Sequence, residues 1–84
     1  MKRIAVIGII IEQNRKMAEE VQKLLSENAD IIQGRMGIPN MQDDIFIISV
    51  VIKAENERIS ALTGKLGRLK NISVKAAITS VEVE

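Results

Sequence analysis

The chain has 84 residues, 12 of them basic and 11 acidic, and it contains neither cysteine nor histidine. This length predicts a single domain over residues 1–84. The absence of cysteine and histidine excludes disulfides and metal sites built from imidazole or thiolate. The interspersed, nearly balanced charges predict no nucleic-acid surface, and no apolar run is long enough to span a membrane. We therefore expect a cytoplasmic protein that needs no metal or other cofactor.

Strands and helices are predicted from the spacing of the apolar side chains. Residues 2–11 are rich in β-branched side chains and predict a strand, and residues 15–27, after Asn14 as N-cap, predict an amphipathic helix. Residues 30–38 predict a second strand, which ends at a proline-containing loop because proline cannot donate to a sheet ladder. Residues 45–53 predict the third strand.

A second helix is predicted between Asn56 and Gly67, and a last strand from residue 72 to 79 with an extension toward 83. Glycine at the end of that helix favours the left-handed backbone conformation. With right-handed crossovers, the order βαββαβ predicts an α+β, ferredoxin-like sandwich. Its four-stranded antiparallel sheet has the order 4-1-3-2, with both helices on one face.

The two central strands of this sheet are apolar on both faces, over residues 4–11 and 45–52. Because the helices cover only one face, the other is predicted to have an apolar centre and a polar rim, the pattern of an association surface. We therefore expect a homo-oligomer, a dimer or a tetramer; the alternative is a half-hydrated sheet face. The residues expected at the interface are Ile7, Ile9, Arg35 and Lys75.

Three segments resemble a known family: R-M-G-I-P at residues 35–39, the strand at 45–53, and A-L-T-G-K-L-G at residues 61–67. The resemblance covers nearly the whole chain and is to short stand-alone proteins described as regulators of the iron-only hydrogenase system. Such proteins are similar in fold to ACT domains and to the C-terminal regulatory domain of the nickel-responsive repressor. The resemblance implies an ACT-like domain linked to hydrogenase regulation or maturation.

Two departures separate this sequence from those similar domains. The turn at residues 12–15 lacks the glycine that many ACT domains place beside a bound amino acid. Without histidine and cysteine, the chain also lacks the ligands with which the repressor domain holds nickel. We therefore expect neither amino-acid binding in the ACT manner nor nickel sensing.

No group of residues predicts catalysis, because His, Cys and Tyr are all absent and no nucleophile–base pair is visible. The segment 63–67 resembles a phosphate loop only in composition, since it lies at a helix C-terminus, where the dipole repels anions. Asp43 and Asp44 are interpreted as a solvated turn rather than a hard-cation site. With Phe46 as the single aromatic residue, the sheet lacks the stacking platform of RNA-binding domains.

Arg35, Gly37 and Pro39 are the candidate ligand-binding residues. Arg35 can meet an anionic ligand or an acidic residue of a partner; alternatively, Gly37 allows a bulge, Pro39 ends the strand and Arg35 is a rim charge. Any small-molecule effector is expected at a subunit interface near these residues. The predicted function is a non-catalytic regulatory or ligand-sensing module acting as a homo-oligomer. The alternative is an assembly factor that binds a protein partner without a small ligand.

Overall fold

The computed structural model describes residues 1–12, 15–38 and 44–84, so Asn14, Pro39 and Asp43 lie outside the described residues. The elements in chain order are β1 (Lys2–Glu12), α1 (Arg15–Glu27), the short 3-10 helix η1 (Ala29–Ile31), β2 (Ile32–Ile38), β3 (Ile45–Ala54), α2 (Asn56–Gly67) and β4 (Ile72–Val83). This order confirms the predicted βαββαβ succession.

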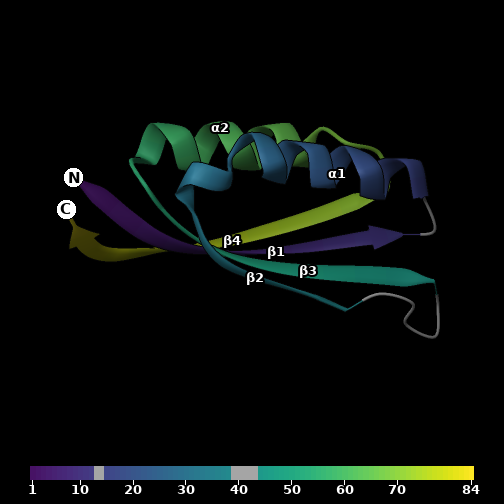
Figure 1. Cartoon of the computed structure of the whole chain (residues 1–84), viewed down its shortest axis with the longest axis horizontal. Helices are drawn as coiled ribbons and strands as arrows, with labels where there is room; N and C mark the ends of the chain where they lie inside the picture. The colour runs from purple at the N-terminus through teal and green to yellow at the C-terminus, as the bar shows by residue number, and fades with distance from the viewer. Residues whose placement is uncertain (13–14, 39–43) are drawn as a thin grey trace.

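The four strands form one antiparallel sheet in the order β2-β3-β1-β4. Read from its other edge, this is the predicted order 4-1-3-2. Both helices lie on the same side of the sheet, and no helix of the described residues lies on the opposite side (Figure 1). No helix among the described residues is long and apolar enough to cross a membrane.

The hydrophobic core lies between the helices and the sheet face that they cover. Alternate residues of the two central strands point into it, and helix residues one turn apart meet them. Its fully or nearly fully buried members are Ala5, Ile7, Ile9, Ile11, Val21, Leu25, Ile31, Ile48, Val50, Ile52, Ala54, Ile59, Leu62 and Leu66. Every one of these side chains is aliphatic, so the fold depends on burial of apolar surface rather than on buried polar pairs.

One strand irregularity decides which way the side chains of β2 point. Ile32 pairs with Ile52, but Gly34 pairs with Val51, so two residues of β2 match one residue of β3. Such a bulge changes the face on which the following residues lie. From Gly34 onward, Met36 therefore points away from the helices and is 62% exposed.

The turn after α2 differs from the prediction in its backbone. α2 does end at Gly67, but no glycine of the described residues has a positive φ, and the C-cap Arg68 is right-handed. The left-handed residue is instead Asn71, with φ of 61°, a conformation that asparagine tolerates better than most residues. The carbonyl of Asn71 accepts from the backbone N–H of Glu12 at 3.0 Å, which ties this turn to the end of β1.

Candidate functional site

The sheet face without helices, here called the open face, carries three rows of side chains across all four strands. The rows follow from the strand register and are Ile38–Ile47–Ile10–Ser73, Met36–Ser49–Gly8–Lys75 and Gly34–Val51–Val6–Ala77. Lys75 is the one charged residue among these twelve. Val6, Ile10 and Val51 in the central strands are 36–40% exposed, and Gly8 with Ser49 leaves a shallow centre between the apolar rows.

Two of the residues predicted at the interface lie on the wrong side of the sheet for that role. Ile7 and Ile9 are 0% exposed and belong to the core beneath the helices. Their neighbours Val6 and Ile10 point to the open face instead, at 40% and 39% exposure. Because β1 is apolar at every position from 4 to 11 except Gly8, the sequence did not distinguish its two faces. Lys75 lies on the open face, paired with Gly8.

Arg35 also lies on the helix side of the sheet rather than on the rim of the open face. It pairs with Val50, which is 0% exposed and points into the core. From the edge strand β2, the Arg35 guanidinium reaches α1, where its Nη2 donates to Oε1 of Gln22. The bulge in β2 accounts for this placement, because it reverses the alternation after Ile32.

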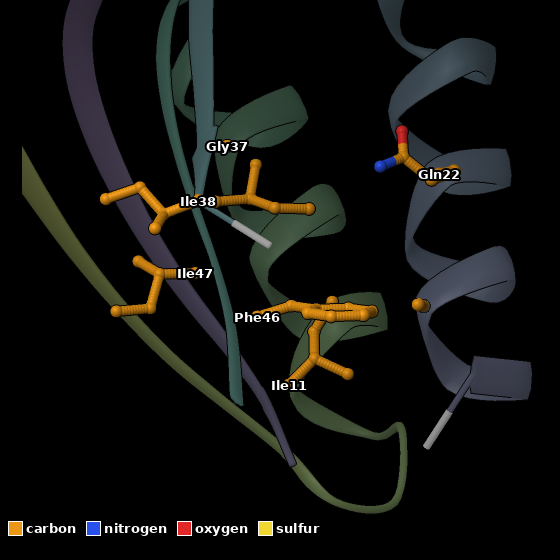
Figure 2. A pocket seen from close by; sticks show the side chains of 8 residues that line it. Ile11, Gln22, Gly37, Ile38, Phe46 and Ile47 are labelled. Carbon is orange, nitrogen blue, oxygen red and sulfur yellow. The ribbon is translucent and has the colours of Figure 1, made fainter. Parts of the chain in front are cut away.

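A pocket of about 350 Å³ lies between α1 and the β2–β3 side of the sheet (Figure 2). Its lining residues come from β1, α1, β2 and β3 and are Ile11, Ala18, Gln22, Gly37, Ile38, Phe46, Ile47 and Ile48. Two small residues, Ala18 on the helix and Gly37 on the strand, leave room between the layers. We call this space the α1–β3 pocket.

The α1–β3 pocket is apolar except at one point. Ile11 and Ile48 are nearly fully buried, and the half-buried Phe46 packs against the core beside them. Figure 2 shows Ile38 and Ile47 pointing away from α1, so these two residues line the pocket by their backbone while their side chains belong to the open face. The pocket and the open face therefore share the same two strand segments.

The polar point is Gln22, whose carboxamide extends from α1 toward the sheet (Figure 2). Its oxygen accepts from Arg35, so the amide N–H groups remain available at the mouth of the pocket. Of the predicted trio, the structure thus brings Gly37 into the pocket lining. Arg35 does not line the pocket itself but contacts the lining residue Gln22, and Pro39 lies outside the described residues. Sequence analysis missed Ala18 and Gln22; their spacing of four residues on one helix face was the available signal.

A second, polar hollow lies at the N-terminal end of α2. There Arg58 donates from Nη1 and Nη2 to the two carboxylate oxygens of Asp30, at 2.6 and 3.1 Å, and also to Asn28 at 3.0 Å. This is the one ion pair among the described residues. The hydrogen bond from Arg58 holds the pKa of Asp30 below its ordinary value, and the same bond raises the pKa of Arg58.

We expect Arg58→Gln to raise the pKa of Asp30 toward the ordinary aspartate value. Because the folded-state pKa is lowered, the pair contributes stability above the unfolded pKa, and that contribution is lost as the pH falls through the folded pKa. The contribution is small, since both side chains are exposed. Carboxyl chemical shifts measured by NMR across the acid range test this; an unchanged Asp30 midpoint in the variant would contradict the pairing.

Comparison with known structures defines the fold class. The ACT domain of GTP pyrophosphokinase from Chlorobium tepidum is 22% identical with a TM-score of 0.76, over 92% of this chain and 100% of that chain. The apo form of CPII, a nitrogen regulatory PII-like protein from Thiomonas intermedia K12, is 15% identical with a TM-score of 0.59, over 94% and 92%. The chain therefore has an ACT-like, ferredoxin-like fold.

The family is defined by two further matches. The sequence pattern of the TM1266-like family, described as proposed regulators of the iron-only hydrogenase system, matches residues 3–76. The uncharacterized protein TM1266 from Thermotoga maritima is 33% identical with a TM-score of 0.89, over 93% of this chain and 98% of that chain. No curated protein matches the sequence. The chain belongs to the TM1266-like family.

Proposed function

We propose that this protein is a cytoplasmic, non-catalytic regulatory module of the iron-only hydrogenase system that senses a small ligand as a homo-oligomer. The observation that carries the proposal is the open face, an exposed apolar surface on the side of the sheet opposite the helices. The family description supports the regulatory role. The ACT and PII-like folds of similar structures fit a module that binds effectors rather than one that performs catalysis.

Self-association is supported by the extent and the composition of the open face. Four strands about 4.8 Å apart and five residues about 3.4 Å apart along each strand span a footprint of roughly 19 by 17 Å. Two such patches in contact bury on the order of 650 Å², so an interface that reaches the roughly 1,000 Å² of a specific complex extends along the strands beyond these three rows. A second copy presents the same apolar rows, which is the condition for a two-fold interface, and Lys75 lies on the outer strand where it stays in water.

The α1–β3 pocket supports the sensing part of the proposal. Its walls at Ile38 and Ile47 carry side chains of the open face. A ligand that shifts these strand segments changes the surface offered to a second copy, so binding and assembly are linked. The pocket thus fits the expectation that an effector binds close to a subunit interface, next to Arg35 and Gly37.

An assembly factor that uses the open face to hold a different protein is the second candidate. The same exposed side chains favour it, since an apolar patch with one lysine fits a partner of matching shape. In that case the isolated chain stays monomeric and small molecules leave its melting temperature unchanged. A partner that co-purifies in a defined ratio and is lost on Val51→Glu supports this second function.

We expect the wild-type chain at micromolar concentration to have a mass of at least twice 9.3 kDa. The physical reason is that the open face loses its contact with water only when another surface covers it. Light scattering coupled to size exclusion measures this mass directly. A mass of 9.3 kDa at all concentrations would remove self-association from the proposal and favour the assembly factor.

A further inference from the structure

The α1–β3 pocket has an apolar lining, and the Arg35 guanidinium lies beside its polar residue Gln22; this combination selects a class of ligand. We propose that the pocket binds a small monocarboxylate with an aliphatic or aromatic body and without an amino group. The inference rests on the sensing part of the proposed function and names the chemistry of the effector.

The apolar body of the ligand follows from the size and lining of the pocket. About 350 Å³ lies at the lower end of the range for small-molecule sites and holds a ligand of roughly six to ten non-hydrogen atoms. Ile11, Phe46 and Ile48 offer only carbon to it. Each methylene group that enters such a lining is expected to tighten binding by about fourfold, until the pocket is full.

The ligand is expected to carry a carboxylate because Arg35 and Gln22 offer hydrogen-bond donors beside the pocket. Arg35 makes one hydrogen bond, to Gln22, and no carboxylate of the described residues pairs with it. Its guanidinium has five donors in a planar fork that matches a carboxylate. Gln22 adds amide N–H groups on the pocket side, with its oxygen already held by Arg35. An anionic oxygen at the mouth is therefore met by two neighbouring donor groups.

The ligand is expected to lack an amino group because the described lining residues offer no anionic acceptor for one. Among the described residues that line the pocket, none is acidic. An ammonium group next to the carboxylate would lie close to the Arg35 cation without an anionic acceptor of its own, and two like charges at short distance repel each other. The lining therefore favours a plain carboxylic acid over an α-amino acid that has the same side chain.

Three probes of equal chain length separate these contributions: hexanoate, hexan-1-ol and norleucine. We expect hexanoate to bind more tightly than either of the other two, and butanoate to bind about fifteenfold more weakly than hexanoate because two methylene groups are removed. NMR titration of the ¹⁵N-labelled wild-type chain measures the affinities. The largest shifts are expected at Ala18, Gln22, Gly37 and Ile48.

Two kinds of variant locate the site. Arg35→Gln is expected to weaken hexanoate binding by about tenfold or more, while Arg58→Gln removes the same charge at the N-terminal end of α2, outside the pocket lining, and serves as the matched control. Ala18→Leu, which fills the pocket from the helix, is expected to abolish binding. Gly37→Ala is the second filling variant, since a Cβ at that position meets the Ile47 carbonyl at an ordinary 3.9 Å and leaves the strand unstrained.

The possible results of these experiments distinguish the monocarboxylate inference from the proposed function. Equal binding of hexan-1-ol and hexanoate, tighter binding of norleucine, or equal affinities of Arg35→Gln and Arg58→Gln would overturn the monocarboxylate inference and leave ligand sensing intact. Failure of every probe to bind at about 10 mM also overturns it, since hexanoate then has no site. If, in addition, the wild-type mass is that of a monomer, the proposed function falls with it.

Discussion

Val6→Glu is expected to give a folded monomer, whereas Ile7→Glu, one residue further along β1, is expected to unfold the chain. Val6 points to the open face and is 40% exposed, so a carboxylate there reaches water in the monomer but becomes an unpaired buried charge in the oligomer. Ile7 is 0% exposed beneath the helices. An ionised glutamate in that position costs several kcal/mol, comparable with the whole stability of a small domain.

Circular dichroism and light scattering on the two variants measure folding and mass separately. Val51→Glu, which is paired with Val6 across the sheet, is expected to behave like Val6→Glu. Ser60→Glu, at an exposed position of α2 on the opposite side of the molecule, is the control that keeps the oligomer. The placement of the two faces of β1 would be wrong if Ile7→Glu stayed folded. If both Val6→Glu and Val51→Glu remain oligomeric, the interface lies on another surface of the domain.

The element order could be predicted from the sequence because it depends on strong local signals, and the sheet order followed from it because right-handed crossovers leave few arrangements. The apolar spacing of α1 and α2 and the β-branched runs of β1 and β3 each define an element without tertiary information. The face assignment of β1 could not be predicted. From 4 to 11 every residue except Gly8 is apolar, and the alternation that normally marks the buried side is missing.

The candidate site could be predicted only in part. The sequence singled out Arg35 and Gly37, and both lie at or beside the α1–β3 pocket. Their surroundings depend on the bulge between Ile32 and Gly34, which no local signal specified. The sequence did not single out Gln22, because a polar residue at an exposed helix position looks like any other solvent-facing residue.

Ile9→Ala is expected to lower the free energy of unfolding by about 2–5 kcal/mol without changing the assembly state. Ile9 is 0% exposed, and its strand partners are Ile48 and Val74. Removing its side chain leaves a cavity that the rigid sheet cannot close. The matched control is Ile78→Ala on β4, where the same truncation at 48% exposure is expected to cost less than about 1 kcal/mol.

Both truncations are best measured by urea unfolding in the Val6→Glu background, because unfolding of an oligomer depends on protein concentration. The urea concentration at the midpoint of unfolding should fall in Ile9→Ala. The slope of the unfolding free energy against urea concentration should stay constant, since the surface exposed on unfolding hardly changes. If Ile9→Ala does not fold, Ile9→Val should lose about 0.5–1.5 kcal/mol. Equal losses of unfolding free energy in Ile9→Ala and Ile78→Ala would contradict the buried position of Ile9. If Ile9→Ala in the wild-type background lost assembly and Ile78→Ala did not, Ile9 would belong to the interface after all.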